Sequence, residues 1–514
     1  MPSSYWYQRV RDGGPTVVLQ ACEETAAQDG STFVNRIDGA AVVEIARALG
    51  EPDSCTTRLK IETQWDCDEG PVGVETLTKA ISAHKGLRRF HLSADYSSQS
   101  PDVEAAVAIA EMIRVNETLV HLSLELINFG DEGMTHILRA LEDNSTLRYF
   151  WTGLTYFGSS GRDTPYRSRG GFALARTLEV NKSLRSIRIQ GPYSDDVVNA
   201  LENSLRINTT LRELGLSGKI SKNGWDSLIE HLRRNEILES LILDNLCPDY
   251  EDDSEGVLCL PGDMLVVNKT IKRLSFGRSG MEIDDDDDIP EIERKIELAS
   301  NRIVSANFLS GLVSNTTLHS LDVRDALIGI EGALVVASAL VANSSLQTLN
   351  LGGNWLGEAG VKVLIHPLTN GDNTSLLSLD IKDSLIEDDV SPDLFPNYST
   401  SGVAALTDLL QNSRLRSLVI SGDRNIVLYA AAAFSAIDGS RRLPRSSNLL
   451  VHDKLKNKVS GENDPLFVSV LYCLLRNNSW STELGTDLRK RLTTYAPIGP
   501  VRETADRKRK AGCL

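Results

Sequence analysis

Apolar residues recur along this chain in one phrase, L-x-x-L-x-L, in which other apolar residues replace leucine in places. Alternating apolar and polar positions are typical of a short β-strand with one buried face. The shortest intervals between copies are 27–28 residues, and longer intervals contain insertions. Weaker copies lie at Leu59/Ile61 and Val17–Leu19. Eleven clear copies begin at Leu87, Leu119, Leu147, Leu184, Leu211, Leu238, Ile271, Leu318, Leu346, Leu376 and Leu415.

Between the copies, apolar residues stand three and four positions apart, which predicts one helix in each interval. The pattern is clearest at Gly332–Asn343, and it recurs at Gly171–Leu178 and Gly402–Leu410. One strand–turn–helix unit cannot bury its own apolar face, whereas stacked units share a continuous core. The sequence therefore predicts an α/β solenoid with parallel inner strands, outer helices and about 11–13 irregular repeats.

The best copy, Leu346–Gly360, reads Leu-Gln-Thr-Leu-Asn-Leu-Gly-Gly-Asn-Trp-Leu-Gly-Glu-Ala-Gly and resembles the ribonuclease-inhibitor type of leucine-rich repeat. Leu119–Gly133 is similar. The resemblance extends over the repeats between residues 55 and 425, and it implies a horseshoe with the strands on the concave side. Because this family includes inhibitors, scaffolds, innate sensors and GTPase activators, the resemblance indicates a fold rather than a function.

Asparagine occupies two repeated positions of interest. The family places Asn or Cys three residues after the last strand leucine, but here only Asn354 follows that rule, so we expect no continuous asparagine ladder and an irregular horseshoe. Ten N-x-S/T sequons also occur, and eight of them precede a strand by three residues. We interpret those eight as helix-end residues in the left-handed conformation rather than glycosylation sites. The ten are Asn116, Asn144, Asn181, Asn208, Asn268, Asn315, Asn343, Asn373, Asn397 and Asn477.

The pattern divides the chain into four parts: an N-terminal cap with a degenerate first repeat (1–55), the solenoid (56–425), a C-terminal helical cap (426–498) and a basic flexible tail (499–514). Turn-forming and charged residues mark exposed insertions in the solenoid. These insertions are residues 155–170, 248–258, 277–298 and 388–400, and a similar stretch, 438–448, lies in the cap. Residues 425–437 and 465–475 are predicted to be helices of the cap.

The 514 residues carry 54 basic and 70 acidic side chains, a formal charge of −16, which argues against a nucleic-acid binder. Most of this charge is local. Residues 249–255 hold five acids and no base, and residues 282–297 hold nine acids and two bases, so these segments contribute −5 and −7. We therefore expect a protein partner with a basic surface, and no nucleic acid.

No chemistry of an enzyme can be assembled from the sequence. Residues 215–221 superficially resemble a phosphate loop but lack its first glycine, and the acidic run 284–288 lacks the glycine and glutamate of a calcium loop. We expect no catalysis, cofactor, metal or small-molecule substrate. The seven cysteines have no C-x-x-C spacing, and neither an N-terminal apolar segment nor a membrane-length apolar run occurs. A cytoplasmic location is expected, and the basic residues 507–510 leave a nuclear one open.

Side chains between the strand leucines face the concave side, because successive residues of a strand point to opposite faces. In four early repeats these positions concentrate aromatic and basic residues over roughly 15 Å. Such residues are the usual anchors of protein interfaces. The candidate partner-binding residues are Arg89, His91, His121, Tyr149, Trp151 and Arg188. The alternative is that Trp151 packs on insertion 155–170. The matching later positions are expected to be bland: Ser240, Ser275, Ser320, Thr348, Ser378 and Ser417.

These features favour a non-catalytic protein-interaction scaffold or recognition module. The alternative is a regulator of a small GTPase, similar to the Ran GTPase-activating family, which shares the repeat type and carries an acidic segment after the repeats. Here the acidic run interrupts the repeats. The sensor part of an immune-type receptor would need a nucleotide-binding domain elsewhere, and a ubiquitin-ligase adaptor would need an F-box-like helix pair that the first fifty residues do not show.

Overall fold

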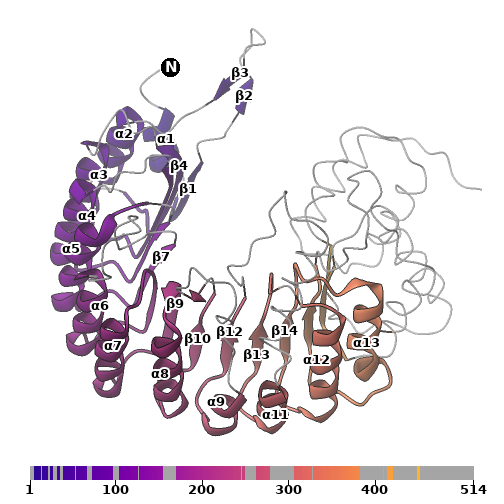
Figure 1. The fold of residues 1–514 in the computed structure, drawn as a ribbon. Helices are drawn as coiled ribbons and strands as arrows, with labels where there is room; N and C mark the ends of the chain where they lie inside the picture. Colours follow the sequence, from indigo (N-terminus) through magenta and orange to yellow (C-terminus); the bar gives the residue numbers. More distant parts are fainter. Residues whose placement is uncertain are drawn as a thin grey trace, which may run out of the picture.

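The chain folds into strand–helix units stacked along an open arc, with the sheet on the inner side and the helices on the outer side (Figure 1). The structure is a computed structural model. It describes residues 5–12, 14–20, 24–26, 32–34, 39–51, 54–65, 72–96, 103–125, 127–153, 169–244, 246–248, 262–277, 306–326, 328–382, 409, 414–420 and 448–451. The predicted solenoid of parallel inner strands and outer helices is therefore confirmed.

The inner layer is a 15-stranded sheet in which neighbours follow the order of the chain and pair in parallel. Only β11 departs from this path, because it pairs with the far end of β9. Its strands are β1 (Thr16–Gln20), β4 (Arg58–Trp65), β5 (Arg89–Tyr96), β6 (His121–Glu125), β7 (Tyr149–Gly153), β8 (Ser186–Gln190), β9 (Glu213–Ile220), β10 (Ser240–Ile242), β11 (Leu246–Pro248), β12 (Arg273–Ser275), β13 (Ser320–Asp322), β14 (Thr348–Asn350), β15 (Ser378–Asp380), β16 (Ser417–Ile420) and β17 (Asn448–Val451). A separate antiparallel pair is formed by β2 (Glu24–Ala26) and β3 (Thr32–Val34).

The outer layer consists of helices that each pack on the next along the arc. Ser194 and Ser221 cap two of them, since their hydroxyls accept the backbone N–H of the third residue beyond. The described helices are α1 (Tyr5–Asp12), α2 (Gly39–Leu49), α3 (Val72–Ala83), α4 (Val103–Val115), α5 (Gly130–Asp143), α6 (Arg169–Val180), α7 (Asp195–Ile207), α8 (Lys222–Arg233), α9 (Gly262–Val267), α11 (Ala306–Ser314), α12 (Ile330–Ala342) and α13 (Gly357–Thr369). None of the helices described is long and apolar enough to cross a membrane.

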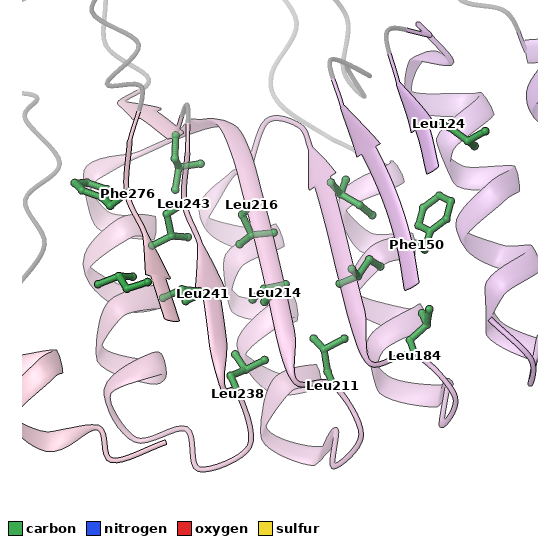
Figure 2. Close-up of a cluster of buried hydrophobic side chains, with 14 of the residues drawn as sticks. Leu124, Phe150, Leu184, Leu211, Leu214, Leu216, Leu238, Leu241, Leu243 and Phe276 are labelled. Atoms are coloured by element: carbon green, nitrogen blue, oxygen red, sulfur yellow. The ribbon is translucent and has the colours of Figure 1, made fainter. Parts of the chain in front are cut away.

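The predicted strand leucines form one continuous core between the two layers. The register stacks equivalent residues on adjacent strands, so that Phe150 pairs with Ile187 and Ile187 with Leu214. Figure 2 shows such side chains of neighbouring repeats projecting into the space between sheet and helices, and all the labelled ones except Phe276 (5%) are at most 2% exposed. Burying one leucine fully is worth roughly 1.5–3 kcal/mol. The repeated pattern therefore supplies the driving force for stacking.

Asparagine side chains form a second continuous element, a hydrogen-bonded ladder along the loops that lead from each helix into the next strand. In Asn343, Oδ1 accepts the backbone N–H of Ser345 and Leu346 at 2.9 and 2.8 Å, while Nδ2 donates to the carbonyl oxygens of Leu312 and Asn315 at 2.7 and 3.1 Å. Such a rung joins its own loop to the preceding repeat, whereas the bonds shown for Asn235 lie within its own loop, from the N–H of Ile237 and Leu238. The buried asparagines at this position are Asn116, Asn144, Asn181, Asn208, Asn235, Asn268, Asn315, Asn343 and Asn373.

The ladder corrects the expectation that these asparagines are left-handed. Asn144, Asn208 and Asn343 have φ of −71°, −74° and −82° with ψ near 125°, which is extended backbone. Asparagine stands there because its carboxamide satisfies both the N–H groups of the turn and carbonyls at the preceding helix end, which have no helical partner. The eight sequon asparagines on the ladder are buried, which supports the structural interpretation over glycosylation. Asn397 and Asn477 lie outside the described residues.

At the family's usual asparagine position, Asn354 makes one rung. Its Oδ1 accepts the N–H of Ala326 and Ile328, and its Nδ2 donates to the carbonyl oxygen of Val323. The sheet also continues past residue 425, because β17 pairs with β16 inside the segment for which a helical cap is predicted. Apart from a few residues at their ends, the insertions lie outside the described part of the chain, as do the rest of the predicted cap and the basic tail.

Candidate functional site

The inner face of β4–β9 presents two rows of side chains that run across the strands. The register of five strand pairs defines both rows. The first row is Arg58, Arg89, His121, Tyr149, Ser186 and Glu213, and the second row is Lys60, His91, Ser123, Trp151, Arg188 and Gly215. All six candidate residues from the sequence thus lie on one face, on four consecutive strands.

Three aromatic side chains meet at the centre of these rows. The ring of His121 stacks on Tyr149 with centroids 5.6 Å apart and meets Trp151 edge-on at 4.5 Å. Tyr149 and Trp151, two residues apart on β7, are 6.5 Å apart and nearly perpendicular. Tyr149 remains 39% exposed. We call His121, Tyr149 and Trp151 the aromatic cluster; it offers an exposed ring backed by two others.

Contacts from β8 and β9 hold Trp151 in place. Its Nε1 donates to Ser186 Oγ at 2.8 Å, and the Arg188 guanidinium lies over its ring, 4.3 Å from the centroid. Ser186 Oγ and Arg188 Nε in turn donate to Glu213 Oε1 at 2.7 and 2.9 Å. At position 215, a Cβ would lie 2.7 Å from Arg188 Cγ, so glycine there makes room for the arginine. The alternative packing of Trp151 on residues 155–170 involves a segment almost wholly outside the described residues.

Glu213 is the anchor of this network that the sequence interpretation missed. Burial raises the pKa of Glu213, but the hydrogen bonds from Ser186 and the charge of Arg188 outweigh burial, and the net pKa lies below its ordinary value. The sequence pattern could have identified Glu213, because this residue occupies the first inward position of its repeat, one strand beyond Ser186 and Arg188.

The two inner-face histidines favour the neutral form. Burial lowers the pKa of His121, and the charge of Arg89, the neighbouring His91 and the charge of Arg188 lower it further. Burial also lowers the pKa of His91, although Glu125, whose Oε1 lies 3.7 Å from His91 Nδ1, opposes the shift. Protonating either imidazole therefore adds charge to a face that already carries arginines.

Four arginines line the edge of the sheet where β5, β7, β8 and β9 begin. Each uses Nη1 to bond a backbone carbonyl in a loop: Arg88 to Thr118, Arg148 to Ser183, Arg185 to Thr210 and Arg212 to Thr209. Arg212 also bonds the carbonyl oxygen of Leu211, and its Nε lies 3.8 Å from Glu239 Oε1. In the other three arginines, one such bond leaves the remaining guanidinium donors available. We call Arg88, Arg148, Arg185 and Arg212 the arginine rim.

The later half of the inner face carries acids in addition to the small hydroxyl residues expected there. The first row does continue mainly with hydroxyls, but the second row continues with Ser275, Asp322, Asn350 and Asp380. Asp322 pairs with Arg324 and accepts a bond from Asn350. Burial raises the pKa of Asp380. The second inward position of these repeats carries acids that a comparison of first positions overlooks.

Neighbouring donors already engage these acids. Just past β10, Asp244 accepts bonds from Ser275 Oγ and the N–H of Gly277 at 2.7 and 2.8 Å, and burial raises the pKa of Asp244. Across the described ranges, no group of three or more His, Cys, Asp or Glu residues could hold a metal ion. Asp244 and Asp322 tie adjacent repeats together through their bonds from Ser275 and Asn350.

The comparisons with known proteins concern the repeat. A family model described as a leucine-rich repeat matches residues 342–364, which contain β14 and the first part of α13. With the stacked strand–helix units, this match identifies the fold as a leucine-rich repeat solenoid. The ribonuclease-inhibitor-like subtype stays a prediction. No curated protein matches the chain.

The solved structures that are similar to the chain include the following three. The Rad7 and Elc1 complex in yeast has 15% identity and a TM-score of 0.41, covering 81% of this chain and 89% of that chain. Leiomodin-1 actin-binding site 2 has 18% identity and a TM-score of 0.24, covering 38% and 88%. The TLR13–ssRNA13 complex has 16% identity and a TM-score of 0.31, covering 72% and 42%. Identities and scores this low say nothing about partners.

Proposed function

We propose that the protein is a non-catalytic recognition module that binds a protein partner on the inner face of β5–β8. Solenoids of stacked repeats present extended concave surfaces for binding. The observation that carries the proposal is the aromatic cluster beside Arg188, which lies on that face with Tyr149 39% exposed. Aromatic and arginine side chains supply most of the energy in protein interfaces.

The rigidity of the cluster supports this role. Trp151 is held by a hydrogen bond and a cation–π contact, and both contacts lead to Glu213. Immobilising a side chain on binding costs roughly 0.5–1.5 kcal/mol. Because the fold has already fixed Trp151 and Arg188, a partner gains their contact area with little further loss of side-chain entropy.

Regulation of a small GTPase stays the alternative proposal. It rests on the acidic run near residues 282–297, which lies outside the described residues, and on the repeat type. Stimulated GTP hydrolysis across a panel of small GTPases would favour this alternative, whereas unchanged hydrolysis would favour simple recognition.

The test compares two aromatic truncations on opposite sides of the arc. Tyr149→Ala with Trp151→Ala removes the cluster, and Phe172→Ala removes a 44% exposed aromatic residue from α6 on the outer side. Proteins captured from the native cell by tagged wild-type chain are identified by mass spectrometry, and circular dichroism checks that each variant folds. We expect the inner-face variant to lose the captured proteins and Phe172→Ala to retain them. Equal capture by both variants would overturn the proposal.

A further inference from the structure

The inner face of the first repeats is basic, although the whole chain carries −16. The first three inward positions of β4–β9 and the arginine rim together hold eight cations and three carboxylates, a balance of +5. The cations are Arg58, Lys60, Arg88, Arg89, Arg148, Arg185, Arg188 and Arg212, and the carboxylates are Glu62, Glu125 and Glu213. The charge of this face is thus opposite to that of the protein.

Several of these charges are compensated within the fold. Lys60 Nζ lies 2.5 Å from Glu62 Oε1, and Arg188 Nη2 lies 2.8 Å from Glu213 Oε1. These two pairs are local, because Lys60 and Glu62 lie on one strand and Arg188 and Glu213 lie on adjacent strands. These pairs leave little net attraction for a ligand.

Arg58 and Arg89 are different. They are direct neighbours in the register of β4 and β5, and both are exposed. Within the described part of the chain, neither forms an ion pair with a carboxylate. Like charges opposite each other on adjacent strands are destabilising. Among the described residues, no carboxylate compensates this pair of guanidinium groups, which lies next to His121 in the same row, and an anion there would relieve the repulsion.

We infer that the partner segment is acidic: its carboxylates pair with Arg58 and Arg89, and an aromatic or large apolar side chain beside them covers Tyr149. The basic partner surface expected from the sequence concerns the acidic segments 249–255 and 282–297, which lie outside the described residues, and not this face. This inference rests on the proposed function and names the chemistry of the partner. A guanidinium matches a carboxylate with two parallel hydrogen bonds, which gives orientation as well as attraction. The arginine rim extends the same attraction along the edge of the sheet.

The register sets the spacing of the recognised residues. Arg89 and Tyr149 are two strands apart in the first row. Two strand spacings amount to ~9.6 Å, and an extended peptide rises ~3.3 Å per residue, so about three residues separate the acidic from the apolar position. The segment thus crosses the strands rather than following one of them.

The surface favours an acidic protein segment over a nucleic acid. Glu62, Glu125 and Glu213 lie among the cations, and they would repel a continuous phosphate backbone. A protein segment avoids this repulsion, because its few carboxylates can face the arginines while neutral residues face the glutamates. The −16 of the whole chain also opposes the approach of a uniformly charged polyanion.

Phage-displayed random dodecapeptides selected on the full chain test this inference. Wild type should enrich Asp and Glu about three positions from Trp, Phe, Tyr or Leu. Arg58→Gln with Arg89→Gln should remove the acidic preference and weaken a selected fluorescent peptide about tenfold at low salt. Arg414→Gln with Arg416→Gln is the matched control, since it removes two exposed arginines at the far end of the sheet. It should leave affinity within about twofold of wild type.

The possible outcomes separate the two proposals. Enrichment of basic peptides, or of acidic peptides that bind the Arg58/Arg89 variant equally well, would overturn the acidic partner and leave the recognition surface intact. Selected peptides whose affinity is unchanged by Tyr149→Ala with Trp151→Ala would overturn the proposed function as well. Tighter binding of polyuridine RNA than of any selected peptide, lost with the arginine pair, would overturn the inference in favour of nucleic acid.

Discussion

The asparagine ladder makes a quantitative prediction at Asn181. Its side chain is 2% exposed, and its Nδ2 donates to the carbonyl oxygens of Leu141 and Asn144 at 2.6 and 2.9 Å. Its Oδ1 accepts the N–H of Ser183 and Leu184, both at 2.8 Å. One side chain therefore satisfies four backbone groups that belong to two repeats.

Asn181→Ala removes all four bonds. The carbonyl of Asn144 keeps a bond from Ser183 Oγ at 3.0 Å, so three buried backbone groups lose their partner. An unsatisfied buried group costs roughly 1–3 kcal/mol, and water entering the small space recovers part of this. We expect the free energy of unfolding to fall by about 3–6 kcal/mol, a large fraction of an ordinary domain's stability.

Urea unfolding followed by circular dichroism measures the loss, with Asn370→Ala as control. Asn370 also ends a helix but is exposed and bonds Asp372, so its replacement should cost less than about 1 kcal/mol. Hydrogen exchange at the amides of Ser183 and Leu184 gives a local reading that does not require two-state unfolding. Equal losses in the two variants, or unchanged exchange at these amides, would refute the structural role of the ladder.

Three further predictions concern backbone space, protonation and charge. Gly218→Ala should lower the free energy of unfolding by roughly 3 kcal/mol or more, because Gly218 has φ +115° and the new Cβ would collide with the carbonyl of Gly191. The control Gly371→Ala, at φ +83° in open space, should lower it by about 1 kcal/mol. Equal unfolding midpoints of the two variants would contradict this prediction. Because the pKa of His121 lies below 6.5 in the fold, the unfolded chain binds this proton first as the pH falls. The stability contributed by the neutral imidazole is therefore present above pH 6.5 and should decline below it. Thermal scans should show a smaller decline for His121→Gln than for wild type. Glu213→Gln should lower the melting temperature yet raise affinity for an acidic peptide roughly two- to fivefold, and weaker binding in anisotropy titrations would disprove the charge argument.

The fold could be predicted because the same spacing of apolar residues recurs in each repeat. Leu214 and its equivalents specify a strand, a buried face and a register at once, so errors in one copy are corrected by the others. The β17 strand escaped prediction because Leu449 and Val451 offer two apolar positions in a segment without the preceding leucine phrase. The long insertions contain no such repetition, so the pattern predicts no helix or strand within them.

The site was predictable only in outline. Alternation placed Tyr149 and Trp151 on the inner face, since the direction of a strand side chain follows from its position. The bond from Trp151 to Ser186 and the network through Glu213 depend on rotamers and on neighbouring strands, which the sequence of one repeat does not specify. The role of the loop asparagines was mistaken for the same reason: their partners, such as the carbonyl of Leu141, belong to another repeat.

The stacking of parallel strands also determines how the molecule responds to tension. Inter-strand hydrogen bonds run along the arc, so a pull between β1 and β17 loads the junctions in series and the weakest opens first. The β4–β5 junction aligns eight residue pairs and the β5–β6 and β6–β7 junctions align five each, whereas the β7–β8, β12–β13, β13–β14 and β14–β15 junctions align three each. In optical tweezers the three-pair junctions are therefore expected to open first, in small steps, while β4–β7, which carry His121 and Tyr149, stay paired at the same force.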